Sequence, residues 1–368
     1  MNITLLGFGT VGSHFYQLCA GRADLHISAV LSRRPRPALT CTVTADYDEI
    51  VRDPSIDIIV EVMGGIEPAY SYLCAAMRAG KHVVTANKQL MCARFDELTS
   101  LAKECGVALR CTAAAGGGIP WLTSLSRAAQ LDEITAVEGI LNGTTNYMLS
   151  AMTNAGADYA AALAKAQELG YAEADPTADV EGLDARRKLV LSADLAFGVN
   201  IREEDIPCVG ISSVTAADIA RAREDDLTCK LIARAEKSGS AVAAFVCPTL
   251  FPASAPEAHT DGTGNLVTLF ASRFGKQSFS GAGAGGWPTG SNVLRDCLDI
   301  AAGCRSFYAD SFTPRSVNLS GTQGKWLFRC MGEYFVRECS AREAFDAYES
   351  YRKDDPHALL ARYAAKEE

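Results

Sequence analysis

Strand-like and helix-like segments alternate through roughly the first 125 residues, and this alternation constrains the fold more than any other feature of the sequence. Apolar runs typical of buried strands occupy residues 2–6, 26–32 and 56–65, and amphipathic segments separate them. Strands joined by helices pair in parallel, because each crossover returns the chain to the same end of the sheet. The pattern therefore predicts an α/β fold with a doubly wound parallel sheet.

The order of elements changes after about residue 127. A strand and a helix precede a long acidic loop, and residues 241–281 have the pattern of antiparallel strands. This arrangement predicts a second domain of α+β type. The expected organisation is a first domain at 1–127 completed by a helix at 291–304, a second domain at 128–290, and a tail at 305–368.

Three glycines at the start of the chain predict a nucleotide site. Gly7, Gly9 and Gly12 form the pattern G-x-G-x-x-G directly after the first predicted strand. The turn needs glycine dihedrals, the second glycine lets the backbone approach a pyrophosphate, and the following helix N-terminus stabilises its charge. A tight turn without a ligand is the alternative, but the strand and helix context favours a Rossmann-type dinucleotide domain. The expected cofactor contacts in this segment are Gly7, Phe8, Gly9, Thr10, Val11 and Gly12.

The second predicted strand indicates which nucleotide binds. In this motif an acid near the end of that strand holds the ribose hydroxyls, but here the strand ends in Ser32, Arg33 and Arg34. Arginines can bind a 2′-phosphate through paired hydrogen bonds. The sequence therefore favours NADP(H), with NAD(H) as the alternative cofactor and a solvated basic turn as the alternative role of the arginines.

Composition limits the partners and the compartment. The formal net charge of −9 argues against nucleic acid, so small molecules are the expected partners. The 13 cysteines are odd in number and show no Cys-x-x-Cys spacing, which argues against a disulfide framework or a zinc site. We find no signal-peptide pattern and no apolar stretch long enough to span a membrane. These features predict a cytoplasmic protein.

The segment 171–191, "YAEADPTADVEGLDARRKLVL", places several acids ahead of a lysine. Asp184 and Lys188 are four residues apart, so they share one face of a helix. A surface ion pair is the simplest reading of such a pair. However, the apolar run that follows places Lys188 in the interior, where burial lowers the pKa of a lysine. A lysine held by a carboxylate in a dry cleft can transfer protons near neutral pH.

Six segments, taken together and in order, resemble the homoserine dehydrogenase family. They are "GFGTVG", "TANKQL", "AAGGGIP", "EGILNGTTNYML", "GAGAGGWPTGS" and the acidic segment. In the acidic segment the matching residues are Ala166, Gly170, Tyr171, Asp175, Pro176, Asp179, Gly182, Asp184 and Lys188. The resemblance extends from the start of the chain to about residue 304.

The resemblance implies reversible hydride transfer between NADP(H) and the pair L-homoserine and L-aspartate 4-semialdehyde. It implies that Lys188 exchanges the proton at the substrate oxygen, that Asp184 binds and orients beside it, and that Lys88 lies between cofactor and substrate. The substrate contacts that it implies are Glu173, Asp179, Asn142, Gly143 and Thr144. The further cofactor contacts are Gly64, Lys88 and Gly285.

The resemblance also implies a monovalent cation and a homodimer. The cation would bind backbone carbonyls at Thr112, Ala115, Gly117 and Ile119, and Thr112 replaces a glutamate that is common in the family. The dimer would form through the sheet of the second domain. Many relatives carry a regulatory module that begins with D-x-P-G, and residues 305–368 contain no such motif. We therefore expect no feedback inhibition through such a module, and a tail that packs on the body or supports oligomerisation.

Two other functions fit part of the sequence. An aspartate semialdehyde dehydrogenase needs a nucleophilic cysteine with a histidine partner, and with five histidines we find no such motif pair. An NADP-sensing protein without turnover would keep the glycine loop, but it would not need both Asp184 and Lys188. The sequence therefore favours an enzyme.

Overall fold

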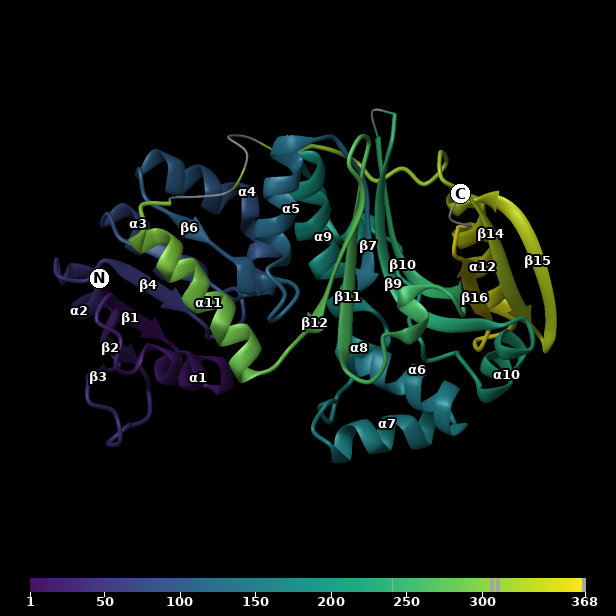
Figure 1. The fold of residues 1–368 in the computed structure, drawn as a ribbon, viewed down its shortest axis with the longest axis horizontal. Coiled ribbons are helices and arrows are strands. Elements are labelled where there is room, and N and C mark those ends of the chain that lie inside the picture. Colours follow the sequence, from purple (N-terminus) through teal and green to yellow (C-terminus); the bar gives the residue numbers. More distant parts are fainter. Residues whose placement is uncertain (240, 305–307, 309–311, 366–368) are drawn as a thin grey trace. The chain divides into compact units, whose positions relative to one another are not determined.

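The computed structural model describes residues 1–239, 241–304, 308 and 312–365. The chain divides into two compact units (Figure 1). Unit 1 comprises Met1–Leu131 and Ala282–Thr313, and unit 2 comprises Asp132–Gly281 and Pro314–Glu368. No helix among the described residues is both long and apolar enough to cross a membrane.

Unit 1 is built on a six-stranded parallel sheet with the strand order β3-β2-β1-β4-β5-β6. This order is that of doubly wound dinucleotide-binding sheets, so the predicted fold class is confirmed. The strands are β1 (Asn2–Leu6), β2 (His26–Leu31), β3 (Thr42–Thr44), β4 (Ile58–Glu61), β5 (His82–Thr85) and β6 (Leu109–Arg110). The central strand β4 is buried along its whole length, as expected for a parallel strand covered on both faces.

The helices of unit 1 bury apolar side chains against this sheet. They are α1 (Thr10–Cys19), α2 (Tyr47–Arg52), α3 (Ala69–Arg78), α4 (Lys88–Glu104), α5 (Trp121–Leu131) and α11 (Gly286–Ala301), with the short 3₁₀ turn η1 (Thr112–Ala114). Although α11 is far from α1 in the sequence, the two helices pack together, and Phe15 and Val293 share one core cluster with strand residues. A side chain at Gly290 would lie 3.2 Å from the backbone of Phe15, so a small residue is needed where the helices meet.

Unit 2 contains a mixed eight-stranded sheet with the order β12-β11-β7-β9-β10-β16-β14-β15. Its strands are β7 (Ile134–Ile140), β9 (Leu227–Ser238), β10 (Ala241–Pro252), β11 (Gly264–Ala271), β12 (Gly275–Ala282), β14 (Gln323–Cys330), β15 (Glu333–Ser340) and β16 (Leu359–Tyr363). The long pair β9 and β10 is antiparallel, and β7 and β11 extend the sheet on one side.

The helices of unit 2 are α6 (Gly143–Ala155), α7 (Tyr159–Glu168), α8 (Thr177–Val180), α9 (Leu183–Phe197), α10 (Ala216–Glu224) and α12 (Ala341–Asp354). Short elements complete the chain: β8 (Val199–Asn200), η2 (Glu203–Asp205), η3 (Pro256–His259) and β13 (Thr313–Pro314). Residue 198 ends α9 as a glycine with φ of +65°, a left-handed conformation that glycine adopts without strain.

The tail belongs to the sheet of unit 2. Strand β16 pairs in parallel with β10, and β14 and β15 form a hairpin beside it. Helix α12 buries Phe345 against Phe245 of β10 and Trp326 of β14, with ring centroids 5.8 and 6.0 Å away. The sequence assigned no structure to this segment, which is joined to the rest of the sheet by β16, and β16 pairs with residues more than 100 positions earlier in the chain.

Candidate active site

The glycine turn of unit 1 has the backbone of a phosphate cradle. Gly7 has φ of +98°, which a residue with a side chain rarely adopts, and a Cβ atom on Gly12 would lie 2.6 Å from the Gly7 carbonyl oxygen. By contrast, a Cβ atom on Gly9 would meet nothing within 4 Å, so the space in front of this residue is open. The first amides of α1 face this space, because the first N–H groups of a helix have no intrahelical partner. The turn therefore fits a dinucleotide pyrophosphate.

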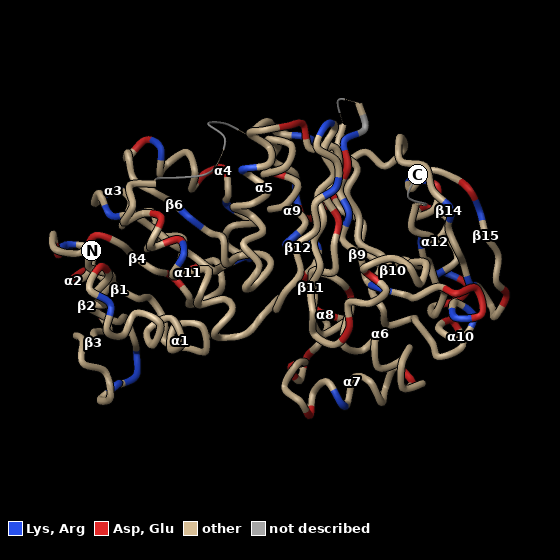
Figure 2. The backbone as a smooth tube through the Cα atoms, viewed as in Figure 1, with Lys and Arg blue, Asp and Glu red and all other residues tan. Residues whose placement is uncertain are grey.

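Basic residues occupy part of the loop that joins β2 and β3 (Figure 2). Arg33 and Arg34 are exposed there. Arg36, which the sequence analysis did not single out, donates from Nη2 to the Phe8 carbonyl at 3.2 Å, and its guanidinium lies 5.2 Å from the centre of the Phe8 ring. Arg36 thus joins this loop directly to the glycine turn.

A buried carboxylate that the sequence analysis missed organises the far side of the cradle. Glu61, the last residue of β4, is fully buried, and its carboxylate accepts hydrogen bonds from Gly64 N at 3.2 Å, Thr85 Oγ1 at 2.6 Å and Asn87 Nδ2 at 3.4 Å. Burial raises the pKa of Glu61, while these hydrogen bonds oppose the shift. Asn87 also caps α4, whose first residue is the half-buried Lys88. Glu61 therefore connects the predicted cofactor residues Gly64 and Lys88.

The segment "AAGGGIP" is held by α11. Asn292 donates from Nδ2 to the carbonyl oxygens of Gly117 at 2.6 Å and Ile119 at 2.9 Å, so these two oxygens converge on one point. The Thr112 hydroxyl donates to Asp296 at 2.7 Å, and its backbone N–H donates to the same carboxylate at 2.8 Å. The threonine at this position is therefore tied to α11. Helix α11 itself begins directly after Gly285, which has φ of +116°.

The predicted lysine and carboxylate form a buried pair in unit 2. Lys188 and Asp184 lie one turn apart on α9, and they are 7% and 5% exposed. Lys188 Nζ lies 2.8 Å from Asp184 Oδ2 and donates to the Leu141 carbonyl oxygen at 2.6 Å. Both partners of the ammonium are thus fixed by the end of β7 and the first turn of α9. The surface ion pair that the spacing alone allows is excluded.

Asn142 donates hydrogen bonds to two acids at this pair, Asp179 and Asp184. As the N-cap of α6, its Oδ1 accepts from Thr145 N at 2.9 Å, and its Nδ2 donates to Asp179 at 2.7 Å and to Asp184 at 2.9 Å. The carboxylates of Asp179 and Asp184 therefore face a common donor. Because like charges repel, this donor helps to hold the two acids close together.

The remaining predicted substrate residues flank this centre. Thr144 donates to the Tyr171 carbonyl oxygen at 2.6 Å, which ties the start of α6 to the acidic loop. A Cβ atom on Gly143 would lie 2.9 Å from the Thr263 carbonyl oxygen. The side chain of Glu173 is exposed, and its backbone carbonyl oxygen accepts from Gln167 Nε2 at 3.1 Å. The structure thus brings Asn142, Asp179, Asp184 and Lys188 together, and it does not bring Glu173 into their hydrogen bonds.

A dinucleotide cradle on a 3-2-1-4-5-6 sheet, with a buried lysine and carboxylate in a second unit, defines a nicotinamide nucleotide-dependent oxidoreductase. The family models for homoserine dehydrogenase and for its NAD-binding domain match residues 120–298 and 7–111. The chain belongs to the homoserine dehydrogenase family.

Individual relatives agree with this assignment. The homoserine dehydrogenase of Corynebacterium glutamicum is 42% identical over 319 residues, which cover 82% of this chain and 72% of that protein. That of Bacillus subtilis is 39% identical over 323 residues, or 83% and 74% of the two chains. A crystal structure of a homoserine dehydrogenase from Thiobacillus denitrificans superposes with a TM-score of 0.90 at 28% identity, covering 99% of this chain and 98% of that one.

These matches confirm the resemblance and the predicted activity. The protein is an oxidoreductase that acts on a CH–OH group and binds a nicotinamide nucleotide. It transfers a hydride reversibly between that nucleotide and the pair L-homoserine and L-aspartate 4-semialdehyde, a step in the biosynthesis of threonine, methionine and isoleucine. The two rival functions are therefore rejected.

Proposed function

We propose that Lys188 exchanges the proton at the C4 oxygen of the substrate. The observation that carries this role is its position: Nζ is buried, 2.8 Å from Asp184 and 2.6 Å from the Leu141 carbonyl oxygen. When the nicotinamide is bound, it accepts or supplies the hydride. The oxidation of homoserine then needs one base for the hydroxyl proton, and the neutral amine of Lys188 takes this proton.

Asp184 acts on the reaction through Lys188. Its carboxylate fixes the direction of the ammonium and stabilises the charge that forms when the amine accepts a proton. Asn142 Nδ2 donates to the same Oδ2 atom of Asp184 at 2.9 Å. A pair held in this way is positioned before substrate arrives, which lowers the cost of reaching the reactive geometry.

We propose that the acidic loop binds the ammonium group of the substrate. Asp179 is the best-placed acid, because it shares the Asn142 donor with Asp184. Glu173 would join it through a movement of the loop, since its side chain is exposed in this structure. Gly143 and Thr144 at the start of α6 would close the amino-acid pocket.

We propose that the cofactor is NADP(H) in preference to NAD(H). Arg33 and Arg34 follow the strand whose end meets the adenine ribose in this fold, and both are exposed for a phosphate. Arg36 supports them by fixing the loop to Phe8. Lys88 would contact the cofactor from the start of α4.

We also propose a monovalent cation at the carbonyl oxygens of Thr112, Ala115, Gly117 and Ile119. The oxygens of Gly117 and Ile119 both accept from Asn292 Nδ2, and the Ile119 oxygen also accepts from Trp121 N at 2.7 Å, so the Gly117 oxygen is the better placed of the two to contact a cation. A comparison of rates in sodium, potassium and tetramethylammonium chloride tests this. Equal rates in the three salts would contradict the cation.

We propose a homodimer through the sheet of unit 2 and a cytoplasmic location. Most of edge strand β12 is exposed, and exposed edges are commonly covered by another chain or element. All 13 cysteines are free, as is usual in a reducing compartment. Sedimentation velocity tests the dimer, and a monomer at micromolar concentration would contradict it.

The experiment for the central role compares Lys188→Ala with Lys165→Ala. Lys165 is exposed on α7 and pairs only at the surface with Glu168, at 2.9 Å. Loss of the proton-transfer group should reduce kcat about 10²- to 10⁴-fold, while the dissociation constant of NADPH changes little. The control variant should keep the native rate. A fall of less than about tenfold in Lys188→Ala, with the cofactor still bound, would reject Lys188 as the proton-transfer group.

A further inference from the structure

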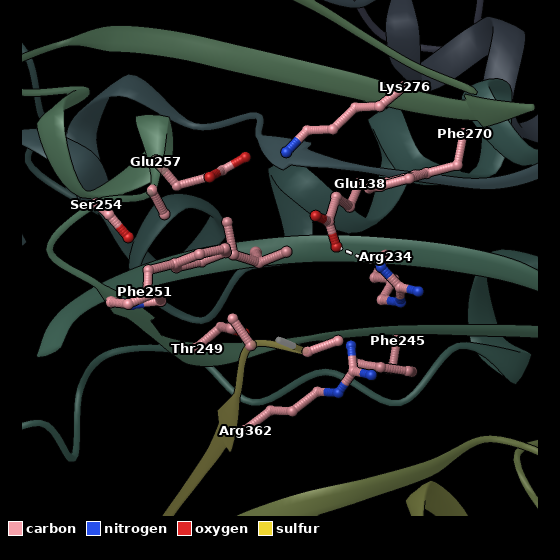
Figure 3. Close-up of a pocket in the computed structure, with 15 residues that line it drawn as sticks. Glu138, Arg234, Phe245, Thr249, Phe251, Ser254, Glu257, Phe270, Lys276 and Arg362 are labelled. Atoms are coloured by element: carbon pink, nitrogen blue, oxygen red, sulfur yellow. Dashed lines mark hydrogen bonds and ion pairs between the residues drawn. The ribbon is translucent and has the colours of Figure 1, made fainter. Parts of the chain in front are cut away.

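Unit 2 contains a cavity that none of the proposed catalytic residues lines. Its volume is about 440 Å³, which lies in the range of small-molecule sites. Strands β7, β9, β10, β11, β12 and β16 supply its walls, together with η3. Figure 3 shows Lys276 and Glu257 on one side of the cavity and Arg362 on the other. Asp184 and Lys188 are not part of this wall.

Arg362 is a buried arginine whose Nε atom has no hydrogen-bond partner among the described residues. It lies on β16, in the tail, and is only 7% exposed. Phe245 and Trp326 lie 5.6 and 6.0 Å from the guanidinium and contact its charge through their rings. The rings stabilise the positive charge of the guanidinium, but they do not accept hydrogen bonds from the N–H groups in its plane. The Nε–H group therefore still lacks a hydrogen-bond acceptor.

The nearest acids serve another cation. Arg234 on β9 lies between Glu138 on β7 at 2.5 Å and Glu236 at 2.6 Å, so both carboxylates are engaged by one guanidinium. Burial lowers the pKa of Arg362, and the positive charge of Arg234 lowers it further, although Glu236 and Glu138 oppose the shift. The two glutamates offset the charge of the two arginines, so an anion would be drawn to the unpartnered Nε of Arg362 and not to an excess of positive charge.

Besides Arg362, the wall carries the charged side chains of Glu138, Arg234, Glu257 and Lys276, and it has an apolar side. Ile232 and Phe251 are 2% and 4% exposed, and Phe270 completes this side of the cavity. A ligand that fits must therefore present an acceptor with negative charge at one end and an apolar body at the other. A carboxylate meets the first condition well, because its two oxygens match the paired N–H groups of arginine.

We propose that this cavity is a binding site for a small apolar carboxylate, with the carboxylate at Arg362 and the apolar body against Ile232, Phe251 and Phe270. The inference does not depend on the role of Lys188. It gives the tail a function in this enzyme, because the arginine that the ligand contacts comes from β16.

The test uses the full chain and three probes of the same shape. They are 3-phenylpropanoate, L-phenylalanine and 3-phenylpropanamide, of which the first carries the carboxylate alone, the second adds an ammonium, and the third has no charge. Binding is measured by isothermal titration and by saturation-transfer NMR. We expect 3-phenylpropanoate to bind at millimolar concentration or below and the amide to bind at least about tenfold more weakly, since a hydrogen bond to a charged group is lost. The amino acid shows whether the site also accepts an ammonium.

Three variants localise the binding. Arg362→Gln should weaken binding at least about tenfold. Ser254→Trp places a large side chain from an exposed position at the rim into the cavity, and it should remove binding. This variant keeps the test possible if Arg362→Gln does not fold. Arg342→Gln is the control, because Arg342 is exposed on α12, outside the cavity wall, and forms a surface ion pair with Asp346 at 4.0 Å. It should bind like the native chain.

Several results would overturn the proposal. They are no binding of 3-phenylpropanoate by the folded native chain, equal binding of the amide, or native-like binding by Ser254→Trp. The native chain could also fail to bind a carboxylate while Ser254→Trp changes the oligomeric state measured in solution. The cavity wall would then be a contact between copies of the chain, which also overturns the proposal.

Discussion

Asn142→Ala is the substitution that most directly tests how the buried pair is built. The native side chain caps α6 through Thr145 N and donates to both Asp179 and Asp184. Loss of an N-cap costs about 1 kcal/mol. The hydrogen bond to the buried Asp184 adds about 2 kcal/mol. Asp179 is half-buried and regains water, so its bond adds little. We therefore expect the free energy of unfolding to fall by about 3 kcal/mol.

The same substitution should lower kcat about tenfold or more, because Asp184 loses the donor that fixes its carboxylate toward Lys188. Unfolding is followed by urea titration, and hydrogen exchange of the peptide 143–155 locates the loss in α6. Asn154→Ala is the control on the same helix, since Asn154 is exposed and donates only to Asp261 at 3.1 Å. It should change stability by less than about 0.5 kcal/mol. A loss below about 1 kcal/mol in Asn142→Ala, with native kcat, would refute this reasoning.

Three other predictions concern the cofactor and the pH dependence. In Gly12→Ala the new Cβ atom meets the Gly7 carbonyl oxygen at 2.6 Å, so NADPH binding measured by fluorescence titration should weaken more than tenfold, to an extent set by how far the turn moves. Replacing Arg33 and Arg34 by serine should raise KM for NADP about tenfold or more and leave KM for NAD within about twofold, and an equal rise for both would contradict phosphate recognition. Burial acts to raise the pKa of Asp132, but the hydrogen bonds it accepts at the β11–β12 turn outweigh it and hold the pKa at about 2, below the ordinary 3.8. This carboxylate therefore stabilises the fold above about pH 3.8 and ceases to do so as the pH falls through about 2, so the difference in urea midpoint between the native chain and Asp132→Asn should shrink from pH 7 to pH 3.

Much of the cofactor half of the site could be predicted because its determinants are local. The glycine spacing places a turn between a strand and a helix, and the alternation of elements predicts the parallel sheet around it. The four-residue spacing of Asp184 and Lys188 predicts one helix face for the same reason. In each case a short stretch of backbone geometry decides the result.

Other parts of the site were not predictable from local patterns. Glu61 ends an apolar strand in "IIVE", and this acid in a buried run is a signal that could have been noticed, but its partners Thr85 and Asn87 lie more than 20 residues away. Asn292 reaches Gly117 and Ile119 across more than 170 positions. Nothing near these residues in the sequence specifies such contacts.

The sequence by itself determined the class of fold, the nucleotide turn and the helix face that carries Lys188, because these follow from periodicity and from the dihedral angles of glycine. The tertiary structure alone decided that Asn142 connects Asp179 to Asp184 and that the tail completes the sheet of unit 2. It also placed Arg362 in the wall of a cavity beside strands from the middle of the chain. Pairing between distant strands depends on the register and burial of the whole sheet, so no short segment of sequence contains it.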